Sequence, residues 1–161
     1  MHTINIRGIR QEDNPQIARV IRDVLEEHGV PKVGTAYADP ELDHMFEAYN
    51  APQSVYFVLE RDGKIVGGAG VAPLKDGDPK VCELQKMYFL APVRGRGFGS
   101  LMIEKCLNAA REMGFETCYL ETMDYMDAAQ KLYRKTGFDY IAAPMGNTGH
   151  CACPVWMTRK L

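Results

Sequence analysis

The stretch "VRGRGFG" at residues 93–99 constrains the fold of this chain more than any other feature, because three of its seven residues are glycine. It stands between a β-like stretch at residues 81–92 and a stretch at 98–113 whose apolar residues recur at helical spacing. A glycine-rich turn that opens a helix directs unpaired backbone N–H groups at one point, where the helix dipole adds positive charge. The stretch therefore predicts a local site for a phosphate-bearing ligand.

The residues inside this turn agree with that prediction. Arg94 and Arg96 would supply charge-assisted hydrogen bonds to phosphate oxygens. Gly97 and Gly99 would let the backbone approach the ligand where a Cβ would intrude. The pattern is neither the dinucleotide-binding fingerprint nor a P-loop, because no simple βαβ unit begins the chain and no Gly-Lys-Ser or Gly-Lys-Thr follows. A glycine turn that serves only the fold is the competing interpretation.

Composition indicates that any anion site must be local. Lys plus Arg number 19 against 21 for Asp plus Glu, so a net charge of -2 gives no basic field to attract nucleic acid or an anionic membrane. With 46% hydrophobic residues, 161 residues can bury a core without disulfides or metal, and we expect one domain over residues 1–161. We also expect a cytoplasmic protein, since the sequence shows no secretory signal or membrane span and its five cysteines are an odd number.

Hydrophobic periodicity and turn residues predict the order of elements along the chain. An Asn cap and Pro15 begin the first helix, which ends before Gly29. An Asp-Gly turn joins two strands into a hairpin. The predicted strands are residues 3–9, 54–60, 65–74, 81–92, 117–122, 138–143 and 155–161, and the predicted helices are residues 14–28, 41–49, 98–113 and 125–136. This order predicts a mixed α/β or α+β domain.

Two motifs in register resemble the GNAT superfamily of N-acetyltransferases. The acetyl-CoA signature of that family is Arg or Gln, two residues, Gly, one residue, then Gly or Ala, and Arg94, Gly97 and Gly99 fill those positions. The second block is "KLYRKTGF", which contains Tyr133 and Gly137. The order and spacing of elements resemble the family over nearly the whole chain. The resemblance implies a central, mixed, mostly antiparallel twisted sheet of about seven strands flanked by about four helices.

The resemblance also implies the chemistry, which is transfer of an acetyl group from acetyl-CoA to an amine in a ternary complex. By the same resemblance, the extended segment before the turn pairs with the pantetheine arm and helps to hold the acetyl carbonyl. The residues expected to bind acetyl-CoA are Met87, Tyr88, Phe89, Arg94, Gly95, Arg96, Gly97, Phe98, Gly99 and Ser100. One departure concerns Met126, which stands where the family often has an Asn that helps to hold the arm.

Three residues are candidates for the catalytic groups. A protonated amine must lose a proton before it attacks, so a base is needed. Glu83 and Glu121 both lie on predicted strands at positions similar to those of bases in two branches of the family, and the choice between them, or a water chain, is open. On a regular strand Glu83 would share a face with Gln85, Met87 and Phe89. Tyr133 would donate a proton to the departing thiolate, the competing interpretation being a packed Tyr whose hydroxyl bonds a backbone carbonyl.

Two loops are expected to border the acceptor. The loop "GHCAC" holds His150, Cys151 and Cys153, but neighbouring ligands at this spacing do not suit zinc, and we expect no metal. In the family the two early helices and their connection shape the acceptor side. We therefore expect the stretch at residues 34–45, with Tyr37, Asp39 and His44, to determine acceptor specificity. We expect a small amine or amino-acid-like acceptor. Acetylation of a protein N-terminus or lysine, a non-catalytic acyl-CoA sensor and a homodimer stay open.

Overall fold

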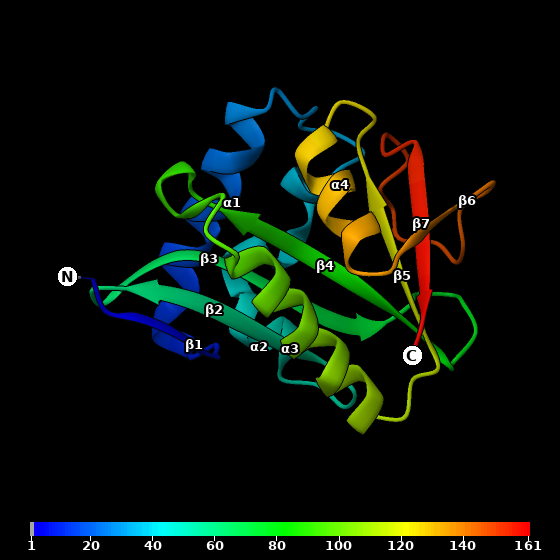
Figure 1. Ribbon diagram of the computed structural model, residues 1–161, viewed down its shortest axis with the longest axis horizontal. Helices are drawn as coiled ribbons and strands as arrows, with labels where there is room; N and C mark the ends of the chain where they lie inside the picture. The colour runs from blue at the N-terminus through cyan, green and yellow to red at the C-terminus, as the bar shows by residue number, and fades with distance from the viewer. Residues whose placement is uncertain (1) are drawn as a thin grey trace.

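The computed structural model describes residues 2–161 and contains a single seven-stranded sheet (Figure 1). Neighbouring strands follow the order β1-β2-β3-β4-β5-β7-β6, and every pair is antiparallel except β4 with β5. The strands are β1 Ile4–Gly8, β2 Val55–Arg61, β3 Lys64–Pro73, β4 Val81–Phe89, β5 Thr117–Thr122, β6 Asp139–Ile141 and β7 Val155–Lys160. The helices are α1 Asn14–Glu27, α2 Met45–Tyr49, α3 Phe98–Glu112 and α4 Asp127–Lys135. The expected mixed, mostly antiparallel sheet with its flanking helices is confirmed.

Helices cover both faces of the sheet and bury a separate core on each (Figure 1). Helices α3 and α4 lie on one face, where Met102, Ile103 and Leu107 of α3 are fully buried. Helices α1 and α2 lie on the other face, where Ile17 and Ile21 of α1 are fully buried. Both α1 and α3 are amphipathic at the spacing that the sequence shows, so burial of their apolar faces holds the helices on the sheet.

The parting of β4 from β5 makes room for a site. These two strands pair only from Val81–Thr117 to Glu83–Tyr119, and β4 then runs on to Phe89 without pairing on that side. Backbone N–H and C=O groups of a strand must find partners when they are buried. The open edge of β4 therefore offers hydrogen-bonding groups to a ligand, at the point where the glycine turn follows.

A β-bulge at Lys86 changes the direction of the β4 side chains. Gly70 of β3 pairs with Gln85, whereas Gly68 pairs with Tyr88, so β4 holds one extra residue, and Lys86 has a φ of 50°. Glu83 and Gln85 consequently face the α1 side, and Met87 and Phe89 face the α3 side. The expectation that all four share one face is wrong, because it assumed a regular strand.

Some boundaries also differ from the sequence-based expectation. Asn14 does not cap α1: Asp13 precedes the helix, and the Asn14 side chain accepts a hydrogen bond from Phe46 N (2.8 Å) at the start of α2. The expected helix at 41–49 is a 3-10 turn, Pro40–His44, followed by α2. Helix α4 begins at Asp127, not Tyr125. These differences reflect tertiary contacts that override local signals.

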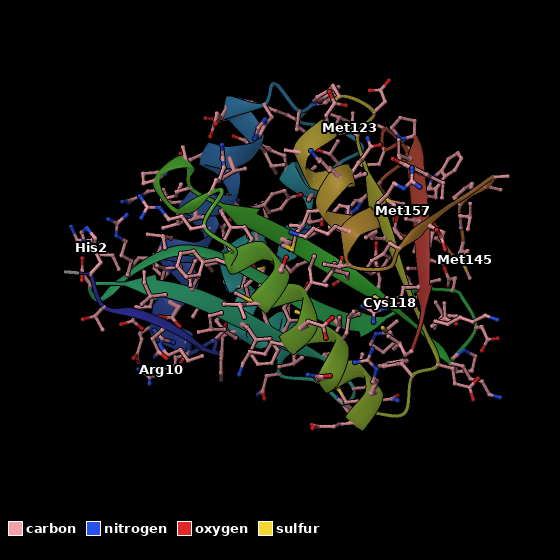
Figure 2. All side chains as sticks on the ribbon, in the orientation of Figure 1. His2, Arg10, Cys118, Met123, Met145 and Met157 are labelled. Carbon is pink, nitrogen blue, oxygen red and sulfur yellow. The ribbon has the colours of Figure 1, made fainter. Side chains whose placement is uncertain are left out.

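The cysteines are free thiols, and three of them lie in the core. Cys118 on β5 and Met157 on β7 are both fully buried beneath the helices (Figure 2). Within residues 2–161, no helix has the length and apolar character that a membrane crossing requires.

Candidate active site

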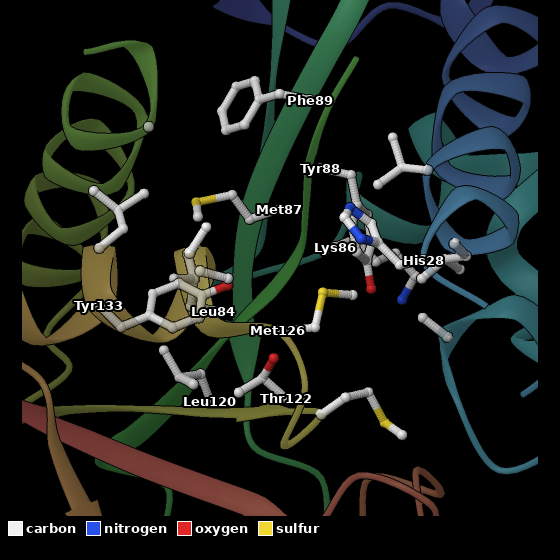
Figure 3. Close-up of a pocket in the computed structure, with 18 of the residues that line it drawn as sticks. His28, Leu84, Lys86, Met87, Tyr88, Phe89, Leu120, Thr122, Met126 and Tyr133 are labelled. Atoms are coloured by element: carbon white, nitrogen blue, oxygen red, sulfur yellow. The ribbon is translucent and has the colours of Figure 1, made fainter. Parts of the chain in front are cut away.

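A cavity of about 690 Å³ lies where β4 and β5 part, and its volume is in the range of small-molecule and cofactor sites (Figure 3). Its walls are β4, β5, the start of α3, helix α4, the end of α1 and the loop residues His150 and Cys153. Figure 3 shows Met87 and Tyr133 pointing in from one side, and Tyr88 and Lys86 lying on the other side of β4. The sequence-predicted residues thus meet around one space.

The glycine turn forms one end of this cavity. Gly95 and Gly97 have φ values of 71° and 85°, which L side chains rarely adopt, and α3 begins at Phe98. The amide groups of the first helical turn have no partner within the helix and carry the positive end of its dipole. This end of the cavity is therefore suited to an anion such as a diphosphate.

Most of the residues expected to bind acetyl-CoA line the cavity, and two do not. The lining includes Met87, Tyr88, Phe89, Arg94, Gly95, Gly97, Gly99 and Ser100. Arg96 is exposed outside the lining, and Phe98 packs against the core on the α3 side. Neither of these two side chains contributes to the wall of the cavity.

Arg94 is already held by protein groups. Its Nη1 and Nη2 donate to the Glu27 carboxylate at 2.7 and 2.9 Å, and its Nε donates to the Phe89 carbonyl at 2.8 Å. The Arg94 hydrogen bonds keep the pKa of Glu27 below its ordinary value. The guanidinium is thus fixed beside the turn, and this side chain links α1 to the end of β4.

Gly99 has a packing role that the sequence did not reveal. A Cβ at this position would lie 2.5 Å from Cδ2 of Leu132. Gly97, in contrast, has no protein atom within 4 Å of such a Cβ. Gly99 therefore lets α3 approach α4, whereas Gly97 leaves open space next to the backbone.

Glu83 lies at the opposite end of the cavity, near the last β4–β5 pair. The residue is 5% exposed, and one carboxylate oxygen accepts a hydrogen bond from Gln85 Nε2 at 2.6 Å. Tyr49 in turn donates to Gln85 Oε1 at 2.5 Å. Burial raises the pKa of Glu83 to about 7, with a further contribution from the negative charge of Glu121. Such a carboxyl exchanges its proton near neutral pH.

Glu121 lies on the same side of the adjacent strand. Tyr119, which pairs with Glu83 across the sheet, donates a hydrogen bond to Glu121 Oε2 at 2.5 Å, and the Thr148 hydroxyl donates to Oε1. Three potential ligand atoms, one each from Glu83, Glu121 and His150, lie within 4.8 Å of one another. The structure therefore brings both candidate bases together and adds an imidazole that the sequence analysis did not include among the catalytic candidates.

A buried ion-pair network fixes this imidazole. Nε2 of His150 lies 2.9 Å from both carboxylate oxygens of Asp39, and Asp39 also lies 3.0 Å from Nζ of Lys86. Lys86 lies 3.1 Å from Glu41 as well, and its side chain is only 2% exposed. Burial lowers the pKa of Lys86, but the two carboxylates outweigh burial and raise it, so the ammonium stays charged. Burial likewise lowers the pKa of His150, and Asp39 reverses that shift.

Tyr133 lies on α4 with its ring edge-on to Phe138, the ring centroids being 6.0 Å apart. The residue is 7% exposed and lines the cavity. Among the described residues, none forms a hydrogen bond with its hydroxyl, so the competing interpretation with a backbone carbonyl is not supported. Burial raises the pKa of Tyr133 above the ordinary value, so the phenol remains protonated.

The other sequence candidates divide into two groups. Met126 and Cys153 line the cavity, and Met126 stands just before α4 (Figure 3). Tyr37 donates to Glu26 at 2.7 Å outside the lining, His44 is exposed, and Cys151 is exposed. Within the described residues, the zinc grouping of His150 with the two cysteines does not form. A contact between residues 111 positions apart, such as Asp39 with His150, leaves no signal in the spacing of motifs.

Comparisons with known proteins agree with this architecture. Residues 19–138 match the model of the acetyltransferase (GNAT) family. The chain is 45% identical over 157 residues to the Escherichia coli K12 protein named "uncharacterized N-acetyltransferase YjgM", covering 97% of this chain and 94% of that protein. It is 25% identical over 137 residues to the Schizosaccharomyces pombe protein "uncharacterized N-acetyltransferase C1271.07c", covering 84% of this chain and 82% of that one.

Solved structures share the fold at low sequence identity. A GNAT-family acetyltransferase from Staphylococcus aureus Mu50 superposes with a TM-score of 0.87 at 21% identity, over 99% of both chains. YncA of Salmonella typhimurium, solved with its cofactor acetyl-CoA, superposes with a TM-score of 0.78 at 18% identity, over 98% of this chain and 94% of that one. The family match, the strong similarity to YjgM and the shared fold together place this chain in the GNAT family of acetyltransferases.

Proposed function

We propose that this enzyme transfers the acetyl group of acetyl-CoA to the primary amine of a small molecule, by direct attack in a ternary complex. One observation carries the proposal: a single cavity contains three features. These are the buried carboxyl of Glu83, whose pKa is about 7, the buried phenol of Tyr133, which has no hydrogen-bond partner among the described residues, and the glycine turn before α3. Phosphate groups fit the turn, and the open edge of β4 fits the amide groups of the pantetheine arm. The YncA structure supports the choice of cosubstrate.

Glu83 acts as the base in this proposal. An ammonium acceptor loses a proton to the Glu83 carboxylate, and the free amine then attacks the thioester carbonyl. The new C–N bond forms as the C–S bond breaks, and the electron pair leaves with the sulfur. The nitrogen then loses its second proton to water, which leaves the neutral amide. A pKa of about 7 leaves a large ionised fraction of Glu83 at neutral pH and keeps the carboxylate basic enough to accept the proton.

Tyr133 assists the departure of the sulfur. Its pKa lies above that of a thiol, about 8.5, so the phenol stabilises the leaving thiolate mainly as a hydrogen-bond donor, and the thiolate finally takes its proton from solvent. The second candidate base, Glu121, already accepts hydrogen bonds from Tyr119 and Thr148. We therefore assign proton removal to Glu83 and the tuning of its pKa to Glu121.

A small acceptor is favoured over a peptide by contacts between two loops. His150 binds Asp39, and the Ala152 amide donates to the Gly34 carbonyl at 3.0 Å. These contacts join the 34–45 stretch to the loop before β7 across the acceptor side of the cavity. A peptide acceptor needs an open groove on that side.

A thiol-release assay with acetyl-CoA tests the proposal on matched acceptors: small primary amines, lysine-containing peptides and peptides with free N-termini. We expect release with small amines and a much slower rate in Tyr133→Phe, with unchanged affinity for CoA. Release of the thiol with peptides but not with small amines would show that the enzyme acetylates proteins instead. Binding of CoA with no release on any acceptor would contradict catalysis.

A further inference from the structure

Three groups that can ligate a metal converge at the acceptor end of the cavity. Glu83 comes from β4, Glu121 from β5 and His150 from the loop before β7, and their ligand atoms lie within 4.8 Å of one another. We infer that these side chains form a binding site for a divalent transition-metal ion, with zinc as the best-matched ion. This set of ligands differs from the group of His150, Cys151 and Cys153 that was considered from the sequence.

The orientation of His150 is the first support for this site. Its Nε2 is held by both oxygens of Asp39 at 2.9 Å, and a carboxylate accepts only, so Nε2 carries a proton. Nδ1 therefore faces the cluster, where the Glu121 carboxylate is 3.9 Å away, beyond hydrogen-bond distance. Histidines that bind metals usually donate their other ring N–H to a carboxylate in this way. Lys86 holds Asp39 in turn at 3.0 Å.

The two carboxylates are the second support. Glu83 is only 5% exposed. Among the described residues, only Gln85 donates a hydrogen bond to its carboxylate, and it does so to one of the two oxygens. Its other oxygen is free to face the cavity. Glu121 is oriented by hydroxyl groups of Tyr119 and Thr148, which leave carboxylate lone pairs for a further partner. Side chains that are already held by hydrogen bonds lose less conformational entropy when they bind a metal than mobile side chains do.

The geometry requires only a small adjustment. Ligands about 2.1 Å from a tetrahedral zinc ion stand about 3.4 Å apart, so the present separations of up to 4.8 Å close with side-chain movements of about an ångström. One imidazole and two carboxylates suit zinc and similar divalent ions, and the two negative charges balance the ion. The cavity leaves further positions for water.

The site overlaps the proposed base. A metal ion on Glu83 would occupy the carboxylate that accepts the proton of the amine, so it would inhibit acetyl transfer in competition with the acceptor. This consequence rests on the proposed function, whereas binding of the metal does not. The glycine turn lies at the other end of the cavity, so acetyl-CoA affinity should be little affected.

Titration of tag-free, metal-free protein with Zn²⁺ by calorimetry tests the binding, and absorption spectra with Co²⁺ report the ligand type. We expect one ion per chain and a Co²⁺ spectrum without a thiolate charge-transfer band. Loss of a ligand in His150→Ala or Glu121→Gln should weaken binding by more than about tenfold, and Asp39→Asn by about tenfold. His150→Gln replaces the alanine variant if thermal unfolding shows that the latter does not fold.

Two controls separate this site from surface binding. His44→Ala and Cys151→Ser remove exposed potential ligands and should leave Zn²⁺ affinity unchanged. No binding to the wild type, full affinity in His150→Ala and Glu121→Gln, or loss of binding in Cys151→Ser would overturn the site. Stoichiometric binding at the cluster without inhibition would leave the metal site standing and contradict the role of Glu83 as base.

Discussion

The two ends of the cavity are built in different ways. The phosphate end consists of backbone: a short contiguous turn with Gly95 and Gly97 in the left-handed region, followed by the first turn of α3. The acceptor end consists of ionisable side chains from distant segments, where Asp39 contacts both Lys86 and His150. Backbone hydrogen-bonding groups are the same whatever the side chains, whereas ionisable side chains differ from one sequence to another. We therefore propose that the specificity for the acceptor resides at the second end.

The largest effect is expected at the acceptor end, in Glu83→Gln. Glutamine keeps the size of the side chain but cannot accept the proton, so the rate of thiol release should fall by about 10²- to 10⁴-fold. CoA affinity measured by calorimetry should not change. For the wild type, kcat/KM should rise with pH around a midpoint near 7 as the carboxyl ionises, and this rise should vanish in the variant. A variant that keeps both its rate and its pH profile would exclude Glu83 as the base.

The next effect concerns the network that supports this end. In Lys86→Met, Asp39 keeps its buried charge but loses its ammonium partner, so the free energy of unfolding should fall by about 3 kcal/mol. Urea unfolding measures the loss. Lys80→Met is the matched control, because the Lys80–Glu116 pair is 3.8 Å apart and about two-thirds exposed, and should contribute less than about 1 kcal/mol. Equal losses in both variants would show that the buried network does not stabilise the acceptor end.

The phosphate end should respond to Gly97→Val. The side chain would fill the open space next to the backbone and strain a φ of 85°, so CoA affinity should fall by about tenfold or more as hydrogen bonds to charged phosphate oxygens are lost. Gly114→Val places the same strain, at a φ of 91°, just past the other end of α3, and its surroundings are equally open. Calorimetry should show weakened CoA binding in the first variant only. Equal weakening would mean that strain in α3, not the approach of the ligand, determines affinity.

The smallest effect tests coupling within the acceptor end. Glu121→Gln removes a negative charge that raises the pKa of Glu83, so the midpoint of the kcat/KM profile should move to lower pH. The rate above the midpoint should change far less than in Glu83→Gln. A profile that loses its acidic limb altogether in Glu121→Gln would reverse the assignment of the two carboxylates.

The sequence predicted the glycine turn and the elements beside it because their signals are local. The strand-to-helix turn before α3 and the strand at residues 117–122 both follow from short patterns. The acceptor end was predicted less well, since the contact of Asp39 with His150 depends on how two loops fold over the sheet. The bulge was missed because a lysine, not a glycine, adopts the positive φ there. The side of the sheet on which Met87 lies follows only from the pairing of β4 with β3.

The extra residue in β4 is held in the strand by charge. Deleting Lys86 would place Met87 directly after Gln85 and restore regular alternation, with Met87 and Phe89 still on the α3 side and Tyr88 still on the α1 side. The deletion would instead remove the ammonium that lies between Asp39 and Glu41. A chain without this residue could therefore keep both cores of the sheet, and would lose only the cation that neutralises two carboxylates next to His150.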